Sequence, residues 1–196
     1  MKKTILVTNN LQLHHLVEEE IKLNGPNCDL NHLDVSNVTD MGWLFQGSDF
    51  NGDISHWNTS NVLKMTGLFK QSQFNGDISR WNTSHVIIMN RLFSHSQFNG
   101  DISGWDTSKA QNMSSMFANS QFDGDISNWN TTNVKDMEYI FDNCPAIVPY
   151  WAKYKDIEQR KIAIAEYHTA LQEKKQLMHN LSESSKACFN QIINKI

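Results

Sequence analysis

The stretch "FNGDISHWNTSNVLKMTGLF" at residues 50–69 contains a motif that the chain repeats at a fixed interval. "FNGDIS" begins at Phe50, Phe74 and Phe98, and "FDGDIS" begins at Phe122, so that the four starts are evenly spaced. A degenerate first copy begins one interval earlier, and five copies therefore cover residues 26–145. A fixed period of this length is typical of repeat proteins, in which each copy buries its apolar face against the next.

Seven apolar positions of each copy predict the core of such a stack. In the second copy they are Phe50, Ile54, Trp57, Val62, Met65, Leu68 and Phe69. The last four are spaced as on one face of a short helix, while "ISHWNTS" at residues 54–60 is typical of a short strand after a glycine turn. The sequence therefore predicts an α/β fold, a right-handed solenoid of five 24-residue turns with short parallel strands and short helices.

Polar positions that recur with the repeat have a structural and a functional interpretation. An aspartate follows the glycine in four copies, as at Asp53, and suits a carboxylate that accepts backbone N–H bonds in a tight turn. Calcium binding is the less favoured alternative, because calcium takes six or more oxygen ligands and needs denser acidic spacing. A second row is expected to hydrogen-bond from turn to turn: Asp34, Asn58, Asn82, Asp106 and Asn130.

Composition excludes several function classes. The net charge of −4 does not favour nucleic acid, and the three cysteines form neither a disulfide framework nor a zinc motif. His32 and His56 share a column but lack a third metal ligand, so a solvated surface pair is expected. We find no nucleophile–base pair and no phosphate-binding glycine loop. The sequence predicts a protein that is not an enzyme and has no metal, cofactor or membrane span.

The two ends of the chain differ from the repeats. Residues 1–25 predict a strand and a helix that cap the stack, with Asn9 or Asn10 before the helix and Gly25 after it. Residues 26–148 form the repeat region, and residues 149–196 predict an α-helical hairpin. Four apolar residues spaced by seven mark its first helix: Ile157, Ile164, Leu171 and Met178. Because Arg160 and Lys174 interrupt a clean heptad, we favour a cap over a homodimer formed through these helices.

The repeats resemble a known family. The second copy follows the pattern W-N-T-S-N-V-x-x-M-x-x-L-F, and "SQFNGDIS" comes after it. This pattern, with the lead-in "LNHLDVSNVTDM" at residues 30–41, resembles the BspA-like leucine-rich repeats and the mycoplasma-lipoprotein-type repeat of about 25 residues. The resemblance covers residues 26–145. It implies a leucine-rich-repeat-like solenoid used for binding, in bacterial surface proteins that act as adhesins or bind host proteins.

Apolar residues at positions that other copies leave polar predict a contact surface. They are Trp43, Leu63, Ile87, Ile88 and Tyr139 in the repeats, with Ile164, Leu171 and Met178 in the helices. We therefore expect a non-enzymatic protein-binding module, bacterial or phage-encoded, that acts inside a cell as an inhibitor or effector by occluding a partner's surface. The alternative is a bacterial cell-surface adhesin-like or host-interaction protein. Lacking the apolar run of a signal peptide, the chain is expected in the cytoplasm, and at the surface or outside only by a non-standard route.

Overall fold

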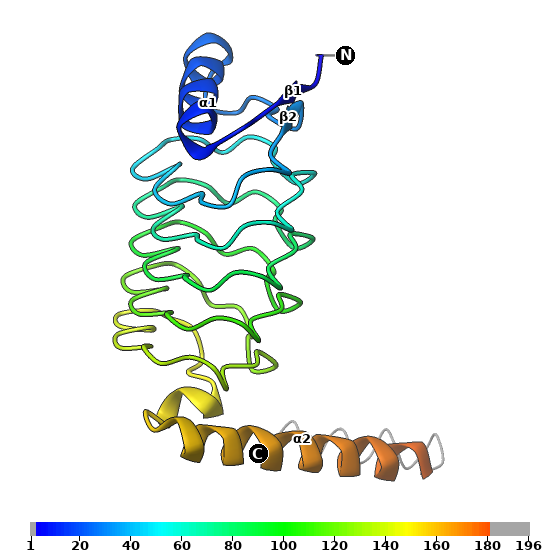
Figure 1. Cartoon of the computed structure of the whole chain (residues 1–196). Coiled ribbons are helices and arrows are strands. Elements are labelled where there is room, and N and C mark those ends of the chain that lie inside the picture. The colour runs from blue at the N-terminus through cyan, green and yellow to red at the C-terminus, as the bar shows by residue number, and fades with distance from the viewer. Residues whose placement is uncertain (1–2, 181–196) are drawn as a thin grey trace.

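The computed structural model describes residues 3–180. Its elements are β1 (Ile5–Leu6), α1 (Asn10–Asn24), β2 (Leu33–Asp34), the 3-10 helix η1 (Tyr150–Lys153) and α2 (Ile157–Asn180). Between β2 and η1 the chain winds in successive coils that lie one above another, with α1 over one end and α2 across the other (Figure 1). Each coil contains one copy of the repeat.

Backbone hydrogen bonds join each coil to the next at alternate residues. The N–H groups of Met41, Trp43, Phe45 and Gly47 donate to carbonyls of the following coil, those of Lys64, Thr66, Leu68 and Lys70, at 2.8 to 3.0 Å. The same bonds recur down to the last pair of coils, where the N–H groups of residues 113, 115, 117 and 119 donate to the coil that ends the repeat. We call these alternate N–H groups the donor row of a coil.

The predicted short helix at Val62–Phe69 is wrong, because this segment is a chain of overlapping turns. Two positions of each coil have a left-handed backbone, for example Trp43 at φ 64° and Gly47 at φ 65°. Such residues break a helix and point every second N–H group toward the neighbouring coil. A helix of two turns is marginal by itself, and the bonds between coils outcompete it.

The predicted strand at residues 54–60 is also wrong. Its backbone turns, with the N–H group of Trp57 donating to the carbonyl of Ile54 at 3.2 Å. Parallel pairing occurs instead as single bridges between coils, in the row Asp40, Lys64, Ile88, Asn112 and Asp136. β1 and β2 form a short parallel pair before this row, with Ile5 opposite Leu33.

Aromatic side chains fill the stack in two continuous rows. The rings of Phe45 and Phe69 are parallel with centroids 5.5 Å apart, and Phe74 lies 4.4 Å from Phe69. Along the second row, the indole N–H of each tryptophan donates to the carbonyl of an isoleucine or leucine in the preceding coil, as Trp105 does to Ile78 at 3.1 Å. The tryptophans are therefore buried without leaving their one polar group unpaired.

An asparagine row bonds coil to coil, but it is not the row that the sequence suggested. The side-chain oxygen of Asn51 accepts the N–H group of Asn75 at 2.8 Å, and Asn75 and Asn99 repeat the contact. The predicted row hydrogen-bonds within its own turn instead, as Asn82 does by accepting from Ser84 at 3.1 Å. A side chain two residues before a turn N–H reaches it more easily than one in the next coil.

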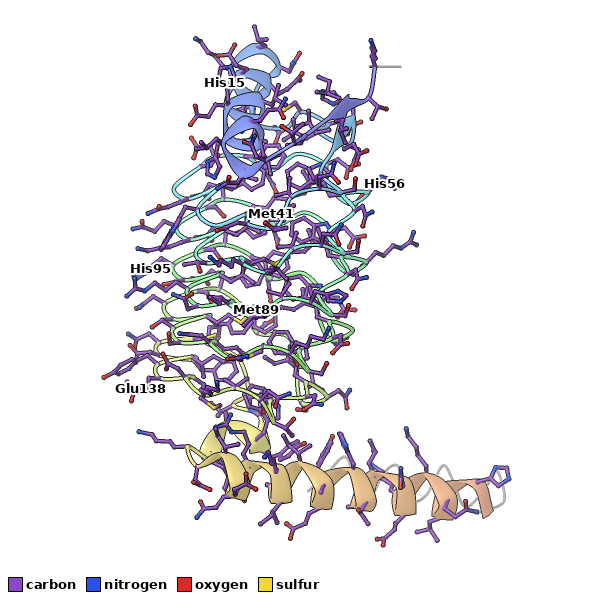
Figure 2. The ribbon with its side chains drawn as sticks, in the orientation of Figure 1. His15, Met41, His56, Met89, His95 and Glu138 are labelled. Atoms are coloured by element: carbon purple, nitrogen blue, oxygen red, sulfur yellow. The ribbon has the colours of Figure 1, made fainter. Side chains whose placement is uncertain are left out.

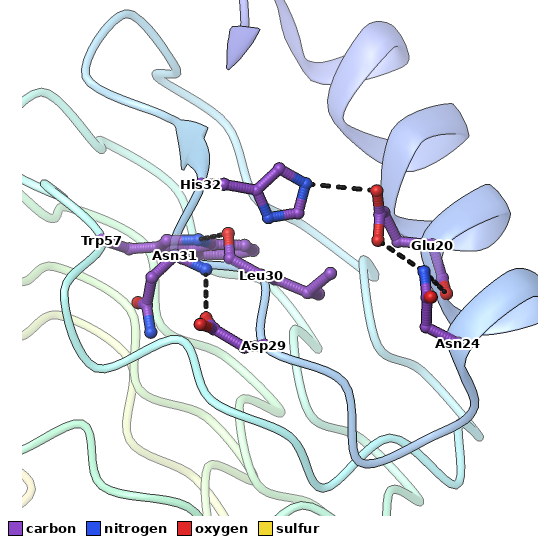
Figure 3. A network of polar contacts seen from close by, with 7 residues as sticks. All are labelled: Glu20, Asn24, Asp29, Leu30, Asn31, His32 and Trp57. Carbon is purple, nitrogen blue, oxygen red and sulfur yellow. Dashed lines mark hydrogen bonds and ion pairs between the residues drawn. The ribbon is translucent and has the colours of Figure 1, made fainter. Parts of the chain in front are cut away.

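The N-terminal end is closed by α1. The side chain of Asn9 accepts the N–H group of Gln12, and Gly25 at φ 84° ends the helix, as the sequence predicts. Leu13 and Val17 of α1 are buried in the core. Figure 3 shows the polar contact that joins α1 to the first coil, with Nε2 of His32 3.1 Å from a carboxylate oxygen of Glu20.

The C-terminal end uses residues outside the repeat. Pro145 stands where the three preceding copies have a glutamine whose N–H group bonds to the coil before it, so the pattern stops there. Trp151 then continues the tryptophan row, because its indole N–H donates to the carbonyl of Ile126 at 3.3 Å. Its side chain is fully buried and lies against Phe141.

Arg160 on α2 is fully buried beneath the last coil. Its guanidinium donates to the carbonyls of Thr131 and Val134 at 3.1 and 2.8 Å, and to those of Tyr154 and Lys155 at 3.0 Å each. The residue that interrupts the heptad is therefore the one that satisfies carbonyls at the end of the stack. The second predicted helix of the hairpin lies outside the described residues.

We predict that Trp105→Ala lowers the free energy of unfolding by about 3–5 kcal/mol, because it leaves a cavity and removes the indole donor from the Ile78 carbonyl, which keeps only the N–H group of Trp81. Trp105→Phe, which keeps a ring but not the N–H, should cost about 1–3 kcal/mol. Chemical denaturation measures both values. Leu11→Ala is the control, since Leu11 is 77 % exposed on α1. A loss equal to that of the control would show that the tryptophan row is not a core element.

Arg160→Met should lower the free energy of unfolding by about 2–4 kcal/mol, because a side chain of similar length leaves the carbonyls of Val134, Tyr154 and Lys155 without a protein donor. Lys161→Met is the matched control on the same helix. The Lys161 ammonium bonds only to Glu158 at the surface, so this change should cost less than about 0.5 kcal/mol. Equal stability of the two variants in denaturant would contradict the capping role of Arg160.

Candidate functional site

One position of the repeat, occupied by a different residue in each of the five copies, forms a continuous row on the stack. After the first member, the N–H group of each residue donates to the carbonyl of the equivalent residue in the preceding coil at 2.8 to 2.9 Å, which places the residues one above another. We call this row the variable row; it consists of Thr39, Leu63, Ile87, Gln111 and Lys135. Its chemistry changes along the stack from hydroxyl to two apolar side chains, then to amide and ammonium.

The apolar part of the variable row is open to solvent in part. The Leu63 side chain is 39 % exposed, and Ile87 is half-buried. Ile88, the next residue along the chain, is half-buried in the row of parallel bridges. The structure therefore brings together Leu63, Ile87 and Ile88, three of the predicted contact residues.

A cavity lies beside the basic end of the variable row. This cavity of about 360 Å³ is lined by Ile87, Gln111 and Lys135 of the row and by Lys109 and Asn133 beside them. The Lys135 ammonium donates to the side-chain oxygen of Gln111 at 3.0 Å. The site thus offers an apolar edge, amide groups and two ammonium groups, which suits the polar and apolar mixture of a protein surface.

Trp43 and Tyr139 occupy the first of the two left-handed positions in the first and last coils, respectively. Four intervals of the repeat therefore separate them. The Trp43 ring packs on Gly67 of the next coil, where a Cβ would lie 2.2 Å from it, and the Lys70 ammonium is 5.8 Å from the ring centroid. One part of the Trp43 side chain is therefore covered by its own stack, and 39 % of it is exposed. Tyr139 is 69 % exposed and lines a different cavity, of about 650 Å³, beside the last coil.

The predicted contact residues of the C-terminal region do not share one surface. Ile164 is only 5 % exposed and packs in the core, so the prediction that it contacts a partner is wrong. Leu171 is half-buried, and the side chain of Met178 lies outside the described part of the chain. Sequence reasoning missed Ile147 and Val148, which are 88 % and 50 % exposed. The sequence feature that could have identified them is an apolar pair directly after the last repeat.

The recurrent aspartates each hold the turn that follows them, as the sequence predicts. Oδ1 of Asp53, Asp77, Asp101 and Asp125 accepts the N–H group of the serine two residues on at 2.9 Å. This backbone hydrogen bond is the main reason why the pKa of each carboxyl lies below its ordinary value of 3.8. Within residues 3–180, no three His, Cys, Asp or Glu side chains are grouped to hold a metal ion.

The two histidines that share a column have different partners. The His32 side chain is 8 % exposed and contacts Glu20, whereas Nδ1 of His56 lies 3.3 Å from the hydroxyl of Ser55. The prediction of a solvated pair is wrong, because α1 covers the first coil. No helix in the described residues is long and apolar enough to cross a membrane.

One family model matches the chain, over residues 12–118 and again over residues 71–183. The family is described as "Mycoplasma protein of unknown function, DUF285". The two matches together run from α1 through the repeats and beyond the end of α2. No curated protein matches the chain, and no solved structure does.

The turn aspartates predict a loss of stability in acid. Because their pKa values are lower in the folded chain than in the unfolded one, they stabilise the fold fully above about pH 4, and this contribution is lost as the pH falls through the folded values. The variant Asp77→Asn/Asp101→Asn keeps an oxygen acceptor that does not titrate. Its melting temperature should fall less than that of the wild type between about pH 5 and pH 3.

The control for this variant is Asp49→Asn, at an exposed aspartate outside the recurrent turns. It removes one carboxylate without changing a recurrent turn, and its melting temperature is measured over the same pH range. Identical pH dependence of the double variant and the wild type in differential scanning calorimetry would show that the turn carboxylates do not couple folding to pH.

Proposed function

Since the chain belongs to the family of Mycoplasma proteins of unknown function, DUF285, we propose a role that the repeat architecture supports, namely binding of a partner protein without catalysis. We further propose that the stack is a right-handed solenoid of the leucine-rich-repeat type, related to the BspA-like repeats. In such a stack the constant apolar residues fill the core, and we propose that binding specificity belongs to the variable row, where Leu63 and Ile87 are apolar and partly exposed.

The observation that carries this proposal is the exposed apolar stretch of the variable row. Leu63 and Ile87 are held one above the other by the bond between the Ile87 N–H group and the Leu63 carbonyl at 2.9 Å. A rigid backbone of this kind presents side chains without a large loss of conformational entropy on binding. The lysines and amides around the adjacent cavity provide the polar rim that usually surrounds an apolar contact.

The mode of action that we propose is occlusion of a partner's surface. The row is a surface along the side of the stack rather than a deep pocket, and such surfaces suit contacts with another folded protein. An inhibitor or effector that acts inside a cell fits this mode, with the partner's active or binding surface covered by the row.

Leu63→Ser/Ile87→Ser should remove partner binding and leave the fold intact. The residues are partly exposed, so the melting temperature should change little, while the apolar contact is lost. Affinity capture of tagged wild type and variant from the native cell, followed by measurement of the captured partner's dissociation constant, tests this. We expect at least about a tenfold weaker complex.

Leu11→Ser on α1 is the matched control, because Leu11 is an exposed apolar residue outside the variable row. It should bind the partner as the wild type does. Equal dissociation constants for all three proteins would exclude the variable row as the binding surface. A wild-type complex in which the partner remains fully active would argue against occlusion.

A further inference from the structure

Within residues 3–180, the N–H groups in the donor row of the last coil have no hydrogen-bond acceptor. In every earlier coil the row bonds to the next coil, as the N–H groups of Met113, Ser115, Phe117 and Asn119 do at 2.7 to 2.9 Å. The equivalent N–H groups of the last coil are those of Met137, Tyr139, Phe141 and Asn143. None of them has a hydrogen-bond acceptor among residues 3–180.

The left-handed residues that orient a donor row are present in the last coil as well. Tyr139 has φ 56° and Asn143 has φ 49°, close to Ser115 at 53° and Asn119 at 56° in the coil before. The backbone of the last coil therefore keeps the conformation that directs alternate N–H groups to one side. The conformation is complete, and only the acceptors of a following coil are absent.

The side chains beside these donors also lack the cover of a following coil. Met113 and Phe117 are fully buried, whereas Met137 and Phe141 at the same positions are half-buried. Both line the cavity of about 650 Å³, together with Tyr139, Val148 and Lys155. The cavity thus combines a row of backbone donors with an apolar floor, the two features that a following coil covers elsewhere in the stack.

We propose that this edge of the last coil binds a segment of a partner polypeptide, which adds to the stack as a further coil would. Seven residues supply the required alternate carbonyls, as Lys64–Lys70 does for the first donor row. Recognition of backbone carbonyls by an open edge, with side-chain pockets alongside, is the principle of strand addition to a sheet. The occupant carries apolar residues that reach Met137 and Phe141. This site is separate from the variable row.

A small anion fits this row less well than a peptide. The donors lie at every second residue and, in the earlier coils, each bonds to a different carbonyl. They do not converge on one point, as the N–H groups of a phosphate-binding turn do. One carboxylate or phosphate would leave most of the row unpaired.

A second copy of the chain is also a poor occupant. The acceptors that match the donor row are the carbonyls of Asp40, Gly42, Leu44 and Gln46 in the first coil, which accept no backbone hydrogen bond within residues 3–180. α1 lies over that end of the stack, with Leu13 and Val17 buried (Figure 1). A second copy would have to displace α1 before its first coil could reach the donor row. At the opposite end of the stack, Figure 2 shows Glu138 at the outer edge of the last coil.

The test uses amide hydrogen exchange and a peptide with the sequence of residues 87–96, "IIMNRLFSHS". Within the protein this segment accepts the donor row of the preceding coil. In the free protein the amides of residues 137, 139, 141 and 143 should exchange at least about tenfold faster than those of residues 113, 115, 117 and 119. Saturating peptide should slow the first set at least about tenfold and leave the second set unchanged.

Variants separate this site from the variable row. Val148→Asp places a charge in the apolar cavity and should weaken peptide binding at least about tenfold, whereas Leu63→Ser should leave it unchanged. A control peptide with aspartate at the positions of Met89, Leu92 and Phe93 should not bind. Circular dichroism checks that each variant keeps its melting temperature.

Four outcomes would overturn the proposal. They are slow exchange of the four amides in the free protein, absence of peptide binding, protection by inorganic phosphate alone, and protection that rises with protein concentration as dimers form. The last would assign the edge to a second copy of the chain. None of these results bears on whether Leu63 and Ile87 bind a partner, so the two proposals fail independently.

Discussion

Alternate backbone N–H groups that donate to carbonyls of the following coil hold this molecule together. They require left-handed residues at two positions of each coil, and non-glycine residues such as Trp43 and Ser115 adopt that conformation at a cost of about 1–2 kcal/mol each. The bonds to the next coil offset this cost. They also explain why the period of the repeat is so regular, because one inserted residue would move the apolar positions out of register with the donors.

A stack joined in this way has a problem at each end, since a terminal coil leaves backbone groups and core side chains uncovered. The two ends of the stack are covered by different elements. At the start, α1 covers the core with Leu13 and Val17 and contacts the first coil through Glu20 and His32. At the C-terminal end, Trp151 extends the indole row and Arg160 donates to carbonyls of the last coil, while the donor row of Met137 to Asn143 has no acceptor within residues 3–180.

The division between constant and varying residues also separates structure from recognition. The recurrent aspartates and asparagines, which look like ligands in the sequence, use their oxygens on backbone N–H groups of the stack. The residues free to meet a partner are those that change from copy to copy, such as Leu63 and Ile87, or those that follow the last copy, such as Val148. Repetition therefore accounts for stability, and the departures from it supply the candidate binding surfaces.

The sequence by itself determined the period, the apolar core positions, the aspartate turns and the end of α1 at Gly25, and it placed the cap of α1 at Asn9 or Asn10, because each depends on residues close together or on strict recurrence. It did not determine the backbone of the repeat, where the spacing of Val62, Met65 and Phe69 suits a helix and a chain of turns equally. Only the tertiary structure decided that question, since the acceptors of those N–H groups lie in the following coil. For the same reason, the sequence did not predict the burial of Arg160, the core position of Ile164 or the donor row of the last coil. Each depends on where the stack ends, and the local sequence does not specify the contacts of a terminal coil.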